Sequence, residues 1–194
     1  MRFRRAFSAA GLGALLAVLP TALAKGPPPT KLDLPPPLQV ARQISAEELL
    51  KSAQLLLPKG AFLGPLLDAR YAVIRHDWLA RRFVPFYRLA VADLRDAADG
   101  GGTEGADCDD FCMFLRHMAG LAGMLGGSAQ PSAAKVIVFQ DRAFSGVGRT
   151  RERHAVGLFL TDKGWYVLEP QTAADLVPLE TYANKNGIQY ISFH

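Results

Sequence analysis

Cys108 is the residue of this chain best placed for nucleophilic chemistry. It opens an amphipathic pattern in which apolar or small residues recur with helical spacing at positions 108, 111, 112, 115, 118, 119 and 122. Asp107 is a suitable N-cap and Asp110 stands close to a capping-box position, so we expect Cys108 in the first turn of a helix. The helix dipole favours the reactive thiolate there, whereas the negative charges of Asp107, Asp109 and Asp110 oppose it. A nucleophile at Cys108 therefore needs a histidine to offset the aspartates.

A predicted hairpin supplies that histidine together with a carboxylate. Residues 154–160 and 165–169 are predicted to be two strands joined by a short turn. With a turn of two or four residues, His154 lies opposite Gln171, and Glu169 lies diagonally across on the same face. A turn of odd length would place Glu169 on the other face. With a turn of even length, the sequence therefore offers a thiol, an imidazole base and a carboxylate that fixes the tautomer of the base.

Three short motifs resemble those of the papain/transglutaminase-like cysteine protease superfamily. They are Asp-Cys-Asp-Asp-Phe at 107–111, His-Ala-Val at 154–156 and Glu-Pro-Gln at 169–171, and they occur in the family's order. The resemblance covers about residues 70–172. It is closest to the C-terminal cysteine-protease domain of a mushroom agglutinin with its bacterial and phage relatives, or to the bacterial transglutaminase-like cysteine proteinases of the periplasm. It implies Cys108 as nucleophile, His154 as general base and acid, and Glu169 as the residue that orients His154.

The resemblance also carries expectations about the rest of the site. Both branches are associated with calcium, for which Asp107, Asp109 and Asp110 are candidate ligands, although the sequence itself requires no cofactor. Papain-like enzymes place a glutamine shortly before the nucleophile for the oxyanion hole, and residues 99–107 contain none. We expect backbone N–H groups of the first helical turn in that role, with Gln171 and Asp109 as the oxyanion or orienting side-chain candidates.

Residues 1–24 are typical of a cleaved export signal. Three arginines precede an apolar run over 9–19, and Ala22-Leu23-Ala24 offers a small-x-small cleavage site. The run is shorter than the roughly 20 residues of a membrane span, so we expect a periplasmic or secreted protein with no integral span after cleavage. A short membrane anchor is the alternative, and the arginine pair leaves export by the Sec or the twin-arginine route open.

Removal of the signal changes the charge balance. Cleavage takes away three of the 22 basic residues and none of the 18 acidic ones, which lowers the formal net charge from +4 to +1. This near-neutral balance gives no electrostatic case for a nucleic-acid partner. The remaining 170 residues are enough for one domain with a core. We expect a proline-rich, polyproline-like linker over 25–43 and a single domain over 44–194.

The order of the predicted elements indicates an α+β fold, with N-terminal helices packed on a small antiparallel sheet. Besides the Cys108 helix and the hairpin, we expect a helix capped by Ser45 and Glu48, a strand at 71–74, helices at 78–83 and 86–96 separated by Pro85, a strand at 135–140, a polar loop at 141–153 and a strand at 188–193.

The leading functional hypothesis is an exported thiol hydrolase, a cysteine peptidase that acts on a protein or peptide through a thioester at Cys108. Two alternatives share its fold: a catalytically inactive binding or assembly module, and transglutaminase or amidase chemistry at the same cysteine. Cys112 adds two more, because it follows Cys108 by one helical turn. The pair lies at about 6 Å in Cα separation, within reach of a strained disulfide, and zinc binding with a further ligand is the other alternative.

Overall fold

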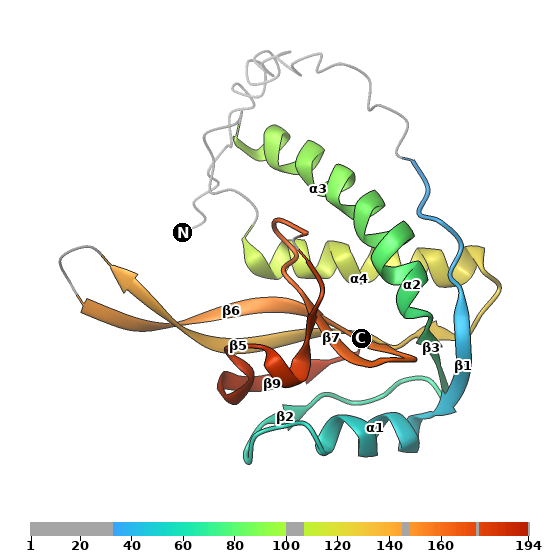
Figure 1. Ribbon diagram of the computed structural model, residues 1–194, viewed down its shortest axis with the longest axis horizontal. Helices are drawn as coiled ribbons and strands as arrows, with labels where there is room; N and C mark the ends of the chain where they lie inside the picture. The colour runs from blue at the N-terminus through green and yellow to red at the C-terminus, as the bar shows by residue number, and fades with distance from the viewer. Residues whose placement is uncertain (1–32, 100–106, 145–147, 174, 194) are drawn as a thin grey trace, which may run out of the picture. The chain divides into compact units, whose positions relative to one another are not determined.

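The computed structural model of the protein describes residues 33–99, 107–144, 148–173 and 175–193. The expected export signal, the first part of the proline-rich segment and the glycine-rich stretch at 100–106 lie outside the described residues. Within them, nine strands and several helices form an α+β fold (Figure 1). The strands are β1 (Val40–Ser45), β2 (Phe62–Leu63), β3 (Arg70–Ile74), β4 (Gln130–Pro131), β5 (Ala133–Phe144), β6 (Gly148–Thr161), β7 (Gly164–Leu168), β8 (Val177–Pro178) and β9 (Ile188–Ser192). The helices are α1 (Ala46–Gln54), α2 (His76–Trp78), the π-helix η1 (Leu79–Phe83), α3 (Val84–Asp99), α4 (Cys108–Leu125) and the 3₁₀ helices η2 (Leu179–Thr181) and η3 (Lys185–Gly187).

The sheet is mixed, so the expected small antiparallel sheet is wrong. Its main path runs β1-β3-β6-β5-β9-β2, with β4 beside β3 and with β7 pairing β6 and β8. The pairs β2·β9, β3·β4 and β3·β6 are parallel. Local patterns predict hairpins well, but they do not report a parallel pairing between strands far apart in the chain. The strands β1 and β3 also precede α2, so the helices do not all come first.

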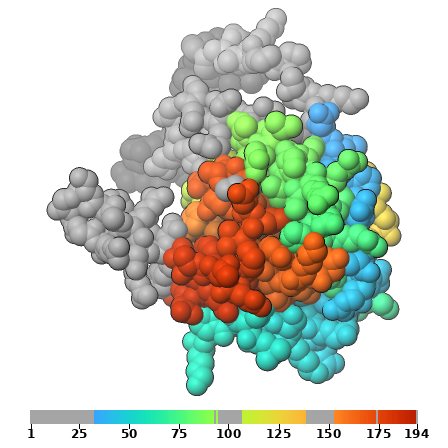
Figure 2. Space-filling model, viewed as in Figure 1, coloured from blue at the N-terminus to red at the C-terminus, as the bar shows by residue number. Residues whose placement is uncertain are grey.

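The helices cover the sheet on two faces, each with its own apolar cluster. Helices α3 and α4 lie on one face and pack with Phe159 and Leu168 of the sheet. Helix α1 lies on the other and packs with Val156 and Leu158 (Figure 1). Alternation along β6 produces this division, because successive side chains of a strand point to opposite faces. On the face shown in Figure 2, the C-terminal part of the chain, in red, lies between α3 in green and α1 in cyan.

Capping fixes where two of the helices begin, as the sequence predicts. The Asp107 carboxylate accepts the N–H groups of Asp109 and Asp110 at 2.9 and 3.4 Å, and the Asp110 carboxylate accepts the N–H of Asp107 at 3.2 Å. Ser45 and Glu48 form the same reciprocal pair at the start of α1. Each box satisfies backbone donors that have no partner inside the helix. The box at Asp107 makes Cys108 the first residue of α4.

Pro85 does not separate two helices, contrary to the expectation. Helix α2, the π-helix η1 and helix α3 follow one another without a break from His76 to Asp99. Proline lacks an N–H and its ring conflicts with the carbonyl four residues earlier in a regular α-helix. The π-helical turn directly before Pro85 changes the hydrogen-bonding pattern at that point, and the chain continues as a helix.

The polar stretch 141–153 is largely strand and not a loop. Strands β5 and β6 stay in unbroken antiparallel register from Ala133↔Phe159 to Phe144↔Gly148. Only the tip, at 145–147, lies outside the described residues. Figure 1 shows this two-stranded ribbon reaching out from the rest of the sheet. Polar composition predicts a loop, but pairing that starts in the buried part of a hairpin sets the register for the residues beyond it.

The folded domain begins before residue 44, where the sequence places the end of a linker. Leu38 is buried, and its N–H donates to the carbonyl of Ala122 on α4 at 2.8 Å. Strand β1 then pairs antiparallel with β3 from Val40 to Ser45. The close approach needs a glycine, because a Cβ on Gly126 would lie 2.8 Å from the Leu38 carbonyl oxygen. In the described part of the chain, no helix is long and apolar enough to cross a membrane.

Candidate active site

The sulfur of Cys108 lies against the backbone of β6. Cys108 is half-buried, and the N–H of Ala155 donates to its Sγ at 3.4 Å. Because Ala155 directly follows His154, the thiol rests beside the strand position that carries the imidazole. The start of the Cys108 helix therefore lies beside β6 next to His154, which stands within this strand and does not open it as expected.

His154 and Glu169 form the tightest polar contact of the site. The β6·β7 register runs from Thr161↔Gly164 to Gly157↔Leu168, so the turn has two residues and the predicted register is confirmed. Glu169 directly follows β7, and its Oε2 lies 2.6 Å from Nε2 of His154. The His154 side chain is 9% exposed and the Glu169 side chain 33%. Glu169 thus holds one ring nitrogen and leaves Nδ1 for another partner.

The thiol and the imidazole reach this place from opposite sides of the sheet. His154 has the same parity along β6 as Val156 and Leu158, which pack away from α4. Cys108 arrives on α4, which packs on the other face. Both groups lie beside the edge that β6 exposes where β7 ends, the sulfur at the Ala155 N–H and the imidazole at Glu169, so the backbone of β6 supports both.

A buried tyrosine that the sequence analysis did not select joins the two halves of the site. The hydroxyl of Tyr87, on α3, lies 3.0 Å from the carbonyl oxygen of Phe111 and 2.9 Å from that of Pro170. Phe111 belongs to the first turn of α4, and Pro170 follows Glu169. Burial raises the pKa of Tyr87 well above its usual value, with Cys112 and Glu169 adding to the effect, so the hydroxyl stays a donor. No local pattern marks these contacts, which span 24 and 83 residues.

The aspartates near the nucleophile have other partners. Asp107 and Asp110 form the capping box, and Asp109 pairs with Nζ of Lys135 at 2.9 Å. Lys135 therefore offsets one of the negative charges that oppose a thiolate at Cys108, a role its place in an apolar run does not indicate. The described residues contain no group of three side chains able to hold a metal ion. Calcium binding at Asp107, Asp109 and Asp110 stays a prediction.

The other predicted groups have distinct places. Gln171 directs its backbone N–H to Oε1 of Glu169 at 3.4 Å, so it adjoins the candidate orienting carboxylate. Asp109, the second oxyanion or orienting candidate, is engaged by Lys135. Cys108 and Cys112 are both free thiols in this structure, which does not contain the alternative disulfide between them. Cys112 is fully buried, and burial raises its pKa to about 12 against the opposing charge of Lys135.

The two thiols should therefore react differently. We expect iodoacetamide at pH 9 to modify Cys108 in the folded protein and to spare Cys112, which peptide mass mapping will resolve. The raised pKa of Cys112 also stabilises the folded state fully below about pH 8.5, and this stability is lost as the pH rises toward 12. A Cys112→Ala variant should thus lose less unfolding free energy between pH 8 and pH 10.5 than the unmodified chain. Equal labelling of both cysteines in folded protein would contradict this assignment.

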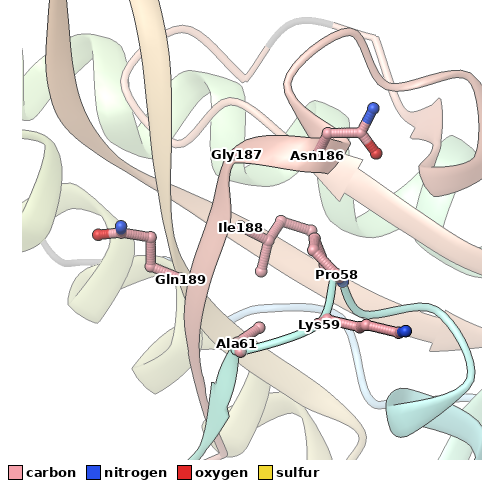
Figure 3. A pocket seen from close by; sticks show the side chains of 8 residues that line it. Pro58, Lys59, Ala61, Asn186, Gly187, Ile188 and Gln189 are labelled. Atoms are coloured by element: carbon pink, nitrogen blue, oxygen red, sulfur yellow. The ribbon is translucent and has the colours of Figure 1, made fainter.

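A surface hollow lies elsewhere on the domain. It measures about 260 Å³ and is formed by the chain between α1 and β2 together with the start of β9 (Figure 3). Its lining residues are Pro58, Lys59, Gly60, Ala61, Asn186, Gly187, Ile188 and Gln189. None of Cys108, His154 and Glu169 lines it, so the hollow is separate from the thiol site.

No model of a known protein family matches the chain, and no curated protein is significantly similar to it. The function is therefore argued from the site. Of the residues selected from sequence, the structure brings Cys108, His154 and Glu169 to one edge of the sheet. His117 is exposed, on the α4 surface.

Proposed function

We propose that this protein is a thiol-dependent hydrolase, most plainly a cysteine peptidase of papain/transglutaminase-like fold, with Cys108, His154 and Glu169 as its triad. One observation carries the proposal. The Cys108 sulfur contacts the backbone N–H of Ala155, while the adjacent residue, His154, has its Nε2 fixed by Glu169 at 2.6 Å. These two contacts near the end of β7 support a nucleophile, a base and a group that orients the base at this place.

The proposal gives each group a role. With Nε2 held by Glu169, Nδ1 of His154 accepts the proton of the Cys108 thiol. The thiolate attacks the substrate carbonyl carbon, and the carbon–nitrogen bond breaks as His154 returns the proton to the leaving amine. Water, deprotonated by His154, then attacks the thioester, which releases the acid product and restores the thiol.

The first turn of α4 offers the donor that an oxyanion needs. The Asp107 side chain takes the N–H groups of Asp109 and Asp110, and the N–H of Phe111 bonds to the Asp107 carbonyl at 3.2 Å. The N–H of Cys108 is the first of the helix and has no intrahelical partner. In the proposed enzyme it stabilises the negative charge that develops on the substrate oxygen.

The order of the elements supports the fold assignment. A helix that begins with the thiol is followed by two antiparallel strands, with the histidine on the first and the carboxylate directly after the second, which is the order of the superfamily that the motifs resemble. The export signal expected at 1–24 would place the reaction in the periplasm or outside the cell. A protein or peptide is the proposed substrate, and no nucleic acid is involved.

Cleavage of a peptide pool tests the proposal. The mature, reduced protein is incubated with unstructured peptides, and new termini are identified by mass spectrometry. We expect cleavage that disappears in Cys108→Ala and persists in Cys112→Ala. Glutamine deamidation or amine incorporation without chain cleavage would replace peptidase by amidase or transglutaminase chemistry. Neither cleavage nor transfer, with no peptide adduct on Cys108, would overturn the enzyme assignment in favour of a binding module.

A further inference from the structure

We propose that Tyr87 is a positioning residue of the thiol site, which holds the end of β7 away from β6 and so reserves the Ala155 N–H for the Cys108 sulfur. The inference rests on the proposed function in one respect only, the reactivity of Cys108. The claim that Tyr87 holds the end of β7 away from β6 depends only on the hydrogen bonds around Pro170.

The first step is the direction of the Ala155 N–H. The N–H of Leu160 donates to the carbonyl of Ser132 at 2.9 Å, on the β5 side of β6. In an antiparallel strand alternate residues direct their N–H groups to opposite neighbours. The N–H of Ala155, which has the other parity, therefore points to the β7 side, and its contact with Cys108 agrees.

The second step concerns the Pro170 carbonyl, which would be the partner of the Ala155 N–H if the β6·β7 ladder continued. The β6·β7 register pairs Gly157 with Leu168, so two residues further along β6 Ala155 would face Pro170. A continuing ladder would bond the Ala155 N–H to the Pro170 carbonyl. Instead the ladder ends at Leu168, and the carbonyl of Pro170 accepts the hydroxyl of Tyr87 at 2.9 Å. The sulfur of Cys108 occupies the place that the strand has left.

The third step is the rigidity of the tyrosine. Its side chain is fully buried, stacked on Phe83 with an interplanar angle of 11° and packed against Phe114. The same hydroxyl contacts the carbonyl of Phe111, three residues after the nucleophile. Tyr87 thus ties the nucleophile helix and the segment after Glu169 to one fixed point. The ring packs independently of the hydroxyl, so Tyr87→Phe removes the hydrogen bonds and keeps the shape.

Tyr71 provides the matched control. It is also fully buried, and its hydroxyl accepts the N–H of Asp68 at 3.3 Å in the other apolar cluster. Tyr87→Phe should lower the thermal stability somewhat more than Tyr71→Phe, because it leaves two buried carbonyl groups without the hydroxyl, whereas Tyr71 accepts a single part-buried N–H. Only Tyr87→Phe should slow the alkylation of Cys108 at pH 6, by about 10-fold, because only it disturbs the support of the sulfur.

The experiment measures two quantities for the unmodified chain and both variants: the alkylation rate of Cys108 at pH 6, and the amide signal of Ala155 in a two-dimensional NMR spectrum. We expect Tyr87→Phe to change both and Tyr71→Phe to change neither. Equal alkylation rates in the two variants would overturn the positioning role. If Cys108 of the unmodified chain reacts as an ordinary thiol, the proposed function fails. The Ala155 signal then decides the inference by itself, and an unchanged signal in Tyr87→Phe overturns it.

Discussion

Replacement of His154 by alanine is expected to slow the alkylation of Cys108 at pH 6 by about 100-fold, while the thiol stays accessible. At this pH an unassisted thiol is almost entirely protonated, whereas a thiol that has given its proton to an imidazole reacts as the thiolate. Without the ring, Cys108 keeps the helix dipole and loses the proton acceptor. The factor of about 100 is at the low end of what a positioned general base contributes to a reaction.

The measurement is the rate of iodoacetamide modification between pH 4 and pH 10, followed at Cys108 by peptide mass mapping. His117→Ala is the control, because His117 is exposed on the same helix. Glu169→Gln should give an intermediate loss, since the amide still contacts Nε2 but no longer supplies the negative charge that stabilises an imidazolium. Identical profiles for the unmodified chain and His154→Ala would remove His154 from the site.

The parts of the site that the sequence predicts correctly depend on local signals. Asp107 and Asp110 act within four residues of chain, and a capping box positions a helix start wherever it occurs. The contact of His154 with Glu169 depends on a two-residue turn, which sets the facing pairs for both strands. Both predictions follow from periodicity and from a short connection, and neither needs knowledge of the rest of the fold.

The parts that were missed or wrong depend on contacts distant in the chain. In the sequence, Tyr87 is an ordinary residue of an amphipathic helix. Only the packed structure shows that its hydroxyl lies within hydrogen-bonding distance of two carbonyl oxygens. Lys135 stands in an apolar strand, where nothing local indicates a carboxylate partner. Residues 34–39 look like linker because of their prolines, yet Leu38 is buried against α4. The composition of a segment predicts only its usual environment. Packing against another part of the fold can bury a residue that the composition predicts to be exposed.

Replacement of Gly157 by alanine is expected to destabilise the domain by about 1–3 kcal/mol and to slow the alkylation of Cys108. A Cβ at this position would collide with Cδ2 of Leu115, a fully buried residue of α4. The absence of a side chain at Gly157 therefore allows α4 to approach β6 closely enough for the sulfur of Cys108 to meet the N–H of Ala155. A helix forced outward lengthens that contact.

Gly120→Ala, on α4, is the matched control for Gly157→Ala. The nearest atom to a Cβ at Gly120 is Nε2 of Gln130 at 4.0 Å, an ordinary contact, so this change should stabilise α4 by about 0.5–1 kcal/mol without affecting Cys108. In Gly157→Ala/Leu115→Ala the two changes should cost less together than the sum of their separate costs, because each relieves the other's misfit. Urea unfolding and the alkylation rate test both statements. Unchanged stability and reactivity in Gly157→Ala would mean that Leu115 moves aside freely, and that the spacing of α4 and β6 is set elsewhere.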